Sequence, residues 1–516
     1  MHHTTTPRSP VFGTMRAWLL QVALVLPLVV VLPGCVQTGV NPVSGNTRAY
    51  GYSWEQEVEM GRKADKQIQQ QYGVYEDEAL QAYVDRVAQK VLAQSHMRRP
   101  DTPPRFRNTE FEFRILDSPI INAFALPGGY VYVTRGLLSH LNNEAQLAVV
   151  LGHEIGHVAA RHSSKQAAQR QFMQGLLVAG AVAGQAAMGG QAAENVLGVG
   201  GQAAQLLSLS YSRGDETESD QLGVEYATLA GYDAAEGAAF FTSLERKQEQ
   251  SGQGLPTWQS THPDPGQREQ NIPRLAQRWE QRTGASAATI NRDVYLDQLR
   301  GTVLGKNPRQ GFTENDIFYH PELAFQFPVP AGWRVINQPS QVAMVEPDQN
   351  AFLLFGFAQE DSPQGAANAF AAQQGVTVVD RSTLSIGGNA ARRVLVEGQT
   401  EQGQTLRLLG YFFEYDGTVY RFQGVAAADN YSAYRPLFTQ SATGFARLTD
   451  ADKLNIQPTR VAVEPASRTA AFSSFVDETR LPSDMSLQDL AILNQVEENE
   501  RIEAGHPLKL PTRSQQ

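Results

Sequence analysis

Cysteine is almost absent from this chain, which has Cys35 as its single cysteine in 516 residues. One cysteine excludes any disulfide within the chain. Positive charge is also in the minority, because 43 Lys and Arg stand against 53 Asp and Glu and leave a net charge of −10. Recognition of phosphate needs clustered basic residues, so this balance argues against nucleic acid as the main partner.

Apolar residues gather near the start of the chain, in the segment RAWLLQVALVLPLVVVLPGC, which ends at Cys35. A basic end, an apolar middle and a small residue before the cut are typical of a secretory signal. The cysteine directly after Gly34 resembles a bacterial lipobox, which predicts cleavage before Cys35 and lipid on its sulfur. The alternative is an uncleaved membrane anchor, although the run is short for a bilayer span and contains Pro27 and Pro33.

The rest of the chain changes its pattern several times. Helical periodicity and strand alternation predict helices over residues 53–72, 77–95, 142–162 and 213–232, and strands over residues 111–116 and 129–134. An Ala-, Gly- and Gln-rich stretch over residues 174–207 is interpreted either as mobile helices that cover a site or as close-packed helices of small residues. An alternating, β-rich pattern follows up to about residue 448, with one helix-like insert at residues 364–375.

Three of the ten histidines lie in the short stretch LGHEIGHVAARH. His153 and His157 are four residues apart, and four residues turn a helix by about 400°, so both imidazoles project from one face. That spacing suits two nitrogens binding one Zn²⁺. Glu154 lies about 100° round the helix, where it can take a proton from water activated by the metal without being a ligand itself. Gly152 and Gly156 weaken the helix, which predicts a neighbouring element in close approach at this face.

A catalytic zinc needs a third protein ligand and one open position. In SRGDETESD, Glu216 and Asp220 are four residues apart, so they share a helix face. Glu216 is the candidate third ligand, and Asp220 could accept the free ring N–H of a ligand histidine. Glu218, which projects about 200° from Glu216, is the competitor for the ligand position. The alternative for all three is an ordinary solvated helix face.

The remaining histidines differ in how well they suit a role in the site. His262, in the stiff loop THPDP, could stabilise a transition-state oxyanion or occupy the open metal position in a resting form. The alternative is a histidine that only anchors the loop. His162 is expected to be structural or exposed, pointing away from the His153–His157 pair, and His140 to be ordinary.

Five separated motifs now occur in order: NPVSG, INAFALPGGYVYVTRGLL, AVVLGHEIGHVAARH, YSRGDETESDQLG and THPDP. Together they resemble the periplasmic zinc metalloproteases of the BepA/LoiP type, relatives of the CAAX prenyl endopeptidases, over residues 39–281. The resemblance implies one Zn²⁺ per chain, held by His153, His157 and Glu216. It also implies that Glu154 is the base and that Asp220 supports a ligand.

The same resemblance implies how a substrate is held. Asn122, Ala123 and Phe124 would border the cleft and pair with an extended substrate backbone, which lets a protease accept varied side chains. His262 or Arg213 could share the charge of the oxyanion. The chain departs from the family pattern at Ser219, where alanine is usual, a change too small to disable the site.

The C-terminal half resembles other modules more loosely. LAFQFPVPAGWRV resembles the opening strands of PsbP-like domains, and the last segment, with LQDLAILNQVEENERIEAGHPLKLP, resembles the second half of a LysM-type module that could contact cell-wall glycan. The expected fold class is α+β: a mainly helical zincin-type metalloprotease domain with a small sheet, an α+β domain and a small C-terminal module. The expected divisions are residues 1–35 (signal), 36–285 (protease), 286–316 (linker), 317–450 (accessory domain) and 454–512 (LysM-like module).

The leading hypothesis is a zinc endopeptidase, anchored by lipid on Cys35 in the bacterial periplasm, that degrades misfolded or stalled envelope proteins. By family analogy, Val36 after the cysteine favours the outer membrane. One rival is an envelope assembly factor or chaperone with a latent metal site, and another is a cell-wall scaffold led by the C-terminal module.

Overall fold

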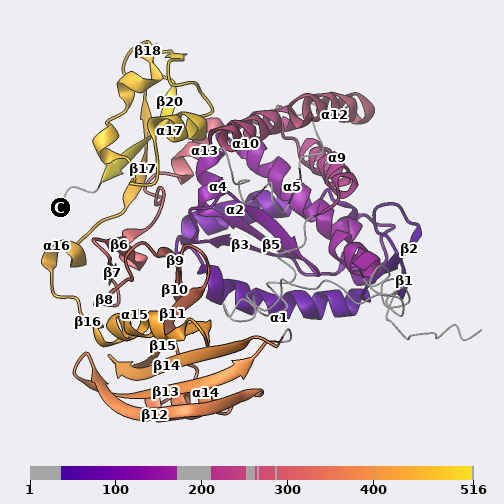
Figure 1. Cartoon of the computed structure of the whole chain (residues 1–516). Coiled ribbons are helices and arrows are strands. Elements are labelled where there is room, and N and C mark those ends of the chain that lie inside the picture. The colour runs from indigo at the N-terminus through magenta and orange to yellow at the C-terminus, as the bar shows by residue number, and fades with distance from the viewer. Residues whose placement is uncertain are drawn as a thin grey trace, which may run out of the picture.

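The computed structural model describes residues 37–170, 211–251, 258, 262–263, 267–284, 288–400 and 403–513. The predictions for the signal, for Cys35 and for residues 174–207 lie outside the described residues. The expected α+β class is confirmed: a helix-rich part that holds a small sheet precedes a sheet-rich part (Figure 1). Every helix in the described ranges is too short or too polar to cross a lipid bilayer.

The helix-rich part begins with a two-stranded hairpin and contains a three-stranded sheet. Its strands are β1 (Gln37–Val40), β2 (Thr47–Tyr50), β3 (Glu112–Leu116), β4 (Ala123–Leu126) and β5 (Tyr130–Thr134). Its helices are α1 (Trp54–Tyr72), α2 (Glu78–Leu92), α3 (Pro104–Arg107), α4 (Arg135–His140), α5 (Glu144–Ala160), α9 (Arg213–Leu229), α10 (Gly237–Ser251), α12 (Arg268–Thr283) and α13 (Arg292–Gln298).

Local sequence explains where the central helices begin and end. The side chain of Asn143 accepts a hydrogen bond from the Gln146 N–H and so caps the start of α5. Helix α5 ends at Arg161, which adopts the left-handed conformation with φ 58°. Helix α9 begins with a capping box between Ser212 and Asp215.

Helix α5 is buried along its whole length and packs against α9 (Figure 1). A Cβ added to Gly152 would lie 2.8 Å from the carbonyl oxygen of Gly223, and one added to Gly156 would lie 3.2 Å from Leu222. The predicted close approach of a neighbour is therefore confirmed, and that neighbour is α9. The glycines let the backbones of the two helices come together, which brings the face of α9 that carries Glu216 next to the two histidines.

The small sheet has the strand order β3-β5-β4, with β3 parallel and β4 antiparallel to β5. Within the described residues, β4 is an edge strand and pairs only with β5. This strand covers Ala123 and Phe124, so the backbone predicted to bind substrate lies at the edge of a sheet, and all four residues of the strand are buried.

The sheet-rich part holds a seven-stranded antiparallel sheet, ordered β12-β13-β14-β15-β11-β10-β9, and a four-stranded sheet, ordered β16-β8-β7-β6. Helices α14 and α15 pack on the large sheet (Figure 1). The strands are β6 (Phe312–Glu314), β7 (Ile317–His320), β8 (Phe325–Pro328), β9 (Arg334–Gln338), β10 (Gln341–Val345), β11 (Ala351–Phe357), β12 (Val376–Ile386), β13 (Asn389–Gln399), β14 (Thr405–Tyr415), β15 (Thr418–Ala427) and β16 (Ala446–Arg447). The helices are α14 (Pro363–Ala371), which matches the predicted insert, and α15 (Tyr431–Thr443).

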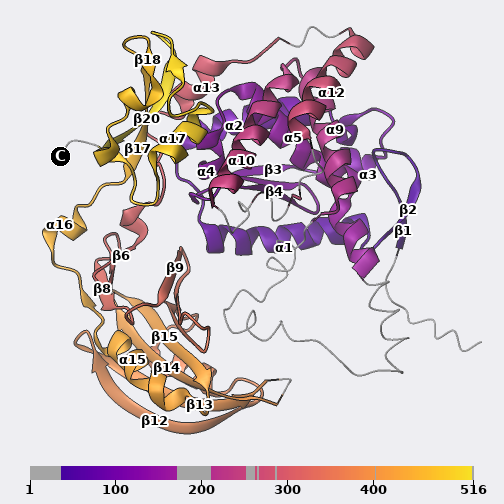
Figure 2. The ribbon, with the colours of Figure 1, turned by 45° about the horizontal axis from the view of Figure 1, so that its top comes forward.

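The chain then returns to the helix-rich part (Figure 2). The last segment contains α16 (Ala451–Leu454), β17 (Thr459–Pro465), β18 (Ala470–Ala471), α17 (Leu487–Asn494), β19 (Arg501–Ile502) and β20 (Pro507–Arg513). Its apolar side chains, among them Val461, Leu490 and Leu508, belong to the same buried cluster as those of α5. The Asn142 side chain also donates a hydrogen bond to the Asn494 carbonyl oxygen, at 2.9 Å. The segment is therefore docked directly beside the start of α5.

Candidate metal centre

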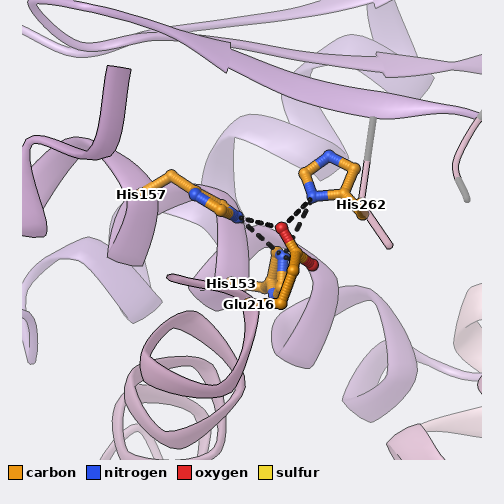
Figure 3. Close-up of side chains that lie close together, drawn as sticks. All are labelled: His153, His157, Glu216 and His262. Atoms are coloured by element: carbon orange, nitrogen blue, oxygen red, sulfur yellow. Dashed lines mark hydrogen bonds and ion pairs between the residues drawn. The ribbon is translucent and has the colours of Figure 1, made fainter. Parts of the chain in front are cut away.

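Four buried side chains converge in the interior of the helix-rich part (Figure 3): His153, His157, Glu216 and His262. Helix α5 supplies the first two and α9 supplies Glu216, whereas His262 lies in the connection between α10 and α12. The predicted pairing of the two helical histidines with a carboxylate from a later helix is thus present in the structure, with a fourth donor beside it.

The spacing of the donor atoms fits one small cation. His153 Nε2 lies 3.0 Å from His157 Nε2 and 3.5 Å from Glu216 Oε2, and His157 Nε2 lies 3.4 Å from Glu216 Oε1. Ligands about 2.0–2.1 Å from a shared tetrahedral centre are separated by about 3.3 Å, and two imidazoles with a carboxylate are a usual zinc donor set. The residues present therefore fit a zinc ion.

His262 completes the set. Its Nδ1 lies 3.1 Å from Glu216 Oε1 and 3.3 Å from His153 Nε2, and its ring stacks on Trp258 at 4.3 Å between centroids. The backbone N–H of His262 donates to the Trp258 carbonyl oxygen, which holds the loop in place. Four donors are the number that a closed tetrahedral site takes, so the place of His262 suits a fourth ligand as well as the oxyanion role.

Asp220 and Arg268 support the cluster from behind. Asp220 Oδ1 lies 2.9 Å from His153 Nδ1, the second-carboxylate contact that the sequence predicts. The buried guanidinium of Arg268, at the start of α12, donates to Asp220 Oδ2 at 2.8 Å and to Glu216 Oε2 at 2.6 Å. Sequence reasoning missed Arg268, because it is 48 residues beyond Asp220 and in no motif that the spacing rules recognise.

Glu154 is fully buried, and neither of its carboxyl oxygens has a hydrogen-bond partner among the described residues. Its neighbour across the cluster is His262, whose Nε2 lies 3.6 Å from Glu154 Oε1. A buried carboxyl group without a partner carries a large desolvation penalty, which a structural residue would avoid. Its place beside the four donors suits a group that accepts a proton during a reaction.

The electrostatics keep two of the carboxylates ionised. Burial would raise the pKa of Glu216, but the attraction of His262 and the hydrogen bonds with His153 and His157 lower it well below its usual range. Burial also opposes ionisation of Asp220, yet the charge of Arg268 lowers its pKa. Burial raises the pKa of Glu154. Two ionised carboxylates and one proton-accepting carboxyl group suit a cation site with an adjacent base.

The pKa values of the two helical histidines are shifted in opposite directions. Burial would lower the pKa of His153, but hydrogen bonds with Asp220 and Glu216 raise it to about 9. Burial lowers the pKa of His157 well below its usual value. A metal ligand must be a neutral imidazole, so a cation bound at Nε2 of His153 would displace the proton there and leave the Nδ1 proton that Asp220 accepts.

One expectation is corrected by the structure. His162 does not point away from the pair: it is fully buried, and its Nδ1 lies 3.0 Å from His157 Nδ1. The left-handed Arg161 ends the helix and turns the next residue back towards the cluster. Arg213 is exposed on the first turn of α9, so its predicted oxyanion role stays a prediction, and the buried cation that contacts the cluster is Arg268.

The other predicted residues lie near the site. Glu218 contacts His162 at 3.2 Å and is not among the four donors. Asn122 is buried directly before β4, and its Oδ1 has no partner in the described part of the chain. Ala123 and Phe124 pair with Val133 and Tyr132 of β5.

Strand β4 also lies beside the cluster. The residues Ala125 and Leu126 of β4 line one small pocket together with His157 and Tyr211. The phenyl ring of Phe124 stacks on Tyr132, and on the side away from β5 the backbone of β4 pairs with no other strand of the described residues.

The sequence around this cluster is similar to a known peptidase family and to several characterised proteins. Residues 78–276 match the model of Peptidase family M48. The chain is 30% identical over 237 residues to the mitochondrial metalloendopeptidase OMA1 of Schizosaccharomyces pombe, covering 45% of this chain and 64% of that protein. It is 28% identical over 214 residues to the beta-barrel assembly-enhancing protease of Escherichia coli K12, covering 39% of this chain and 40% of that protein. The chain thus spans less than two thirds of these relatives.

Among solved structures, the cyanobacterial PsbP of Synechocystis matches at 14% identity with a TM-score of 0.22, over 25% of this chain and 91% of that protein. A similarity of this size assigns neither a fold nor a function to this part of the chain. The PsbP-like and LysM-like assignments and the predicted domain divisions stay predictions.

Proposed function

We propose that the protein is a zinc-dependent endopeptidase. The observation that carries the proposal is the buried group of His153, His157 and Glu216 at zinc-ligand spacing, next to the unpartnered carboxyl group of Glu154. The matches to a peptidase family and to relatives named as metalloendopeptidase or protease support it.

A zinc ion held by these residues would supply a Lewis acid that polarises the scissile carbonyl group and makes a water molecule more acidic. Glu154 would then accept the proton of the attacking water and pass it to the leaving amine. Asp220 accepts the Nδ1–H of His153 and fixes the tautomer that leaves Nε2 free. Arg268 holds Glu216 and Asp220 in their relative places through its two hydrogen bonds.

The edge of β4 is the proposed substrate-binding surface. An extended peptide could add to this edge through main-chain hydrogen bonds, with Asn122 at its start, and such pairing is tolerant of side-chain identity. Tolerance of this kind suits a protease that removes misfolded proteins.

The experiment combines metal content with peptide hydrolysis. Wild-type protein is expected to bind one zinc and to cleave casein in a manner that a chelator abolishes. Glu154→Gln should retain the zinc and lose cleavage by about 100-fold or more, because it removes the base alone. His153→Ala should lose both. Cleavage that survives both substitutions would refute the proposal.

We further propose that the natural substrates are misfolded or stalled proteins of the bacterial envelope and that the chain is anchored by lipid at Cys35, at the outer membrane. The signal-like segment before Cys35 and the similarity to beta-barrel assembly-enhancing proteases support this. Mass spectrometry of the N-terminal peptide should find a lipid on Cys35, and Cys35→Ala should release the protein from membranes. Glycan contact by the C-terminal segment can be tested by retention of the full chain on purified peptidoglycan.

A second function, an assembly factor with a latent metal site, is favoured by one observation: His262 occupies the fourth corner of the cluster. A protein of this kind would bind its partners without cleaving them. Zinc-loaded protein that is inactive on casein, and remains inactive when His262 is replaced, would support this function over the endopeptidase.

A further inference from the structure

The two helical histidines of the cluster need the same kind of support. A neutral imidazole that offers Nε2 to a metal carries its proton on Nδ1, and this N–H needs an acceptor when it is buried. For His153 the acceptor is Asp220 Oδ1, at 2.9 Å. No carboxylate in the described part of the chain contacts His157 Nδ1, and the group that does is the ring of His162, at 3.0 Å.

We propose that His162 is the positioning residue for His157 and that it connects this ligand to the carboxylates of Asp215 and Glu218. The proposal rests on the proposed zinc site. His157 Nε2 faces the other donors of the cluster, so Nδ1 is the nitrogen that carries the proton (Figure 3). His162 Nδ1 must then accept it, which leaves the proton of His162 on Nε2.

Two carboxylates lie near Nε2 of His162 and can accept the proton that this nitrogen carries. His162 Nε2 lies 3.2 Å from Glu218 Oε2 and 3.6 Å from Asp215 Oδ1. The order of hydrogen bonds is therefore His157 Nδ1–H to His162 Nδ1, and His162 Nε2–H to Glu218. The first ligand histidine is supported by a carboxylate directly, and the second is supported by a carboxylate through one neutral imidazole.

The surroundings hold this relay in one geometry. His162 is fully buried, and Tyr211 stacks on the His157 ring at 4.0 Å between centroids. Asp215 accepts hydrogen bonds from Lys165 and from the Ser212 hydroxyl group. A ring that is packed on its face and bonded at both nitrogens has little freedom to rotate, so His157 Nε2 stays aimed at the cluster.

A second cation between His162, Asp215 and Glu218 is the competing explanation, because these three side chains also lie close together. Both carboxylates already have a cationic neighbour, however. Lys165 Nζ pairs with Asp215, and Arg48 lies 3.8 Å from Glu218. Two carboxylates that are already compensated attract a further divalent ion weakly, so the hydrogen-bonded relay explains the arrangement better.

Ser219 offers a matched control. Its hydroxyl group lies 3.3 Å from the same Nδ1 of His162, but the Nδ1 proton of His157 does not need it. Removing this hydroxyl group changes the immediate surroundings of His162 and leaves the relay intact. An effect specific to the relay should therefore appear at His162 and be absent at Ser219.

The test measures zinc affinity of the full-length protein by competition with a chromophoric chelator, together with the visible spectrum of the cobalt(II) form. His162→Phe keeps a ring and removes the acceptor, and should weaken zinc binding by about 10- to 100-fold and alter the cobalt spectrum. His162→Asn, whose amide oxygen can replace the acceptor, should restore most of the affinity. Ser219→Ala should bind zinc within about twofold of wild type.

Folding is controlled separately. Circular dichroism and thermal melting of the metal-free variants should match wild type. If His162→Phe does not fold, Glu218→Ala replaces it, because Glu218 is partly exposed, and it should weaken zinc binding by about fivefold.

The outcomes separate the hypotheses. Unchanged affinity and an unchanged cobalt spectrum in every folded variant, with one zinc bound, would overturn the positioning role and leave the proposed function standing. Two metal equivalents in wild type, of which one is lost in Glu218→Ala, would overturn it in favour of a second cation site. A wild-type protein that binds no zinc would instead refute the proposed function itself.

Discussion

Arg268 donates a hydrogen bond to Glu216 Oε2 at 2.6 Å, so a buried cation holds the carboxylate that faces the two histidines. The same guanidinium contacts Asp220 and lies over the ring of Phe241. The planar guanidinium presents Nε and one terminal nitrogen to the two carboxylates in a fixed geometry, whereas a lysine ammonium group is a point charge on a flexible stem. The position of the proposed zinc ligand therefore depends on a residue outside the ligand set.

This dependence predicts the effect of Arg268→Lys. The variant should bind zinc about 10- to 100-fold more weakly and lose cleavage in proportion, because Glu216 loses its orientation. Chelator competition and a casein assay measure the two effects. Arg274→Lys on the exposed side of the same helix is the matched control and should behave as wild type. Equal affinities in the two variants would contradict this role of Arg268.

The place of His262 predicts a gain of activity on its removal. Its Nδ1 lies within 3.3 Å of two proposed ligand atoms, so it fills the corner that water or substrate needs. His262→Ala should therefore raise casein cleavage and weaken zinc binding by about tenfold, as expected for the loss of one of four ligands. Loss of cleavage with zinc fully retained would favour the oxyanion role instead.

The docking of the last segment predicts a loss of stability in Asn142→Ala. Asn142 is buried just before α5, and its side chain donates to the carbonyl oxygen of Asn494. Leaving that carbonyl oxygen without this donor should lower the free energy of unfolding by about 1–3 kcal/mol. Chemical denaturation measures it, and the exposed Asn46→Ala should change stability by less than about 0.5 kcal/mol. If the two variants were equally stable, the contact would contribute nothing.

The buried His140 predicts a loss of stability in acid. Burial lowers the pKa of His140 to about 4, and its Nδ1–H donates to the Gly136 carbonyl oxygen. Below pH 6.5 the unfolded chain binds a proton at this residue and the folded chain does not, so stability falls as the pH drops from 6.5 towards 4. The pKa difference corresponds to about 3 kcal/mol.

The measurement compares wild type with His140→Phe. Denaturation at pH 7.5 sets the reference for each protein, and the variant should then lose about 3 kcal/mol less between pH 6.5 and 4. Parallel losses in the two proteins would mean that His140 does not contribute to the pH dependence.

The central helices and the spacing on their faces followed from sequence, because both depend on residues close together in the chain. Asn143 and Ser212 fix where α5 and α9 begin through hydrogen bonds to neighbouring N–H groups. The four-residue spacing of His153 and His157 then sets their common face. Glycines inside α5 also signalled a close neighbour, which is α9.

Only the tertiary structure decided which distant groups complete the site. Arg268 reaches the cluster because α12 packs on α9, and no local pattern encodes that packing. His162 turns inward because Arg161 adopts a left-handed conformation, which helical periodicity cannot foresee. The docking of residues near Asn494 beside α5 likewise depends on contacts across more than 350 positions of sequence. Local hydrogen bonding sets the elements, whereas burial of charge and apolar surface between remote segments sets their partners.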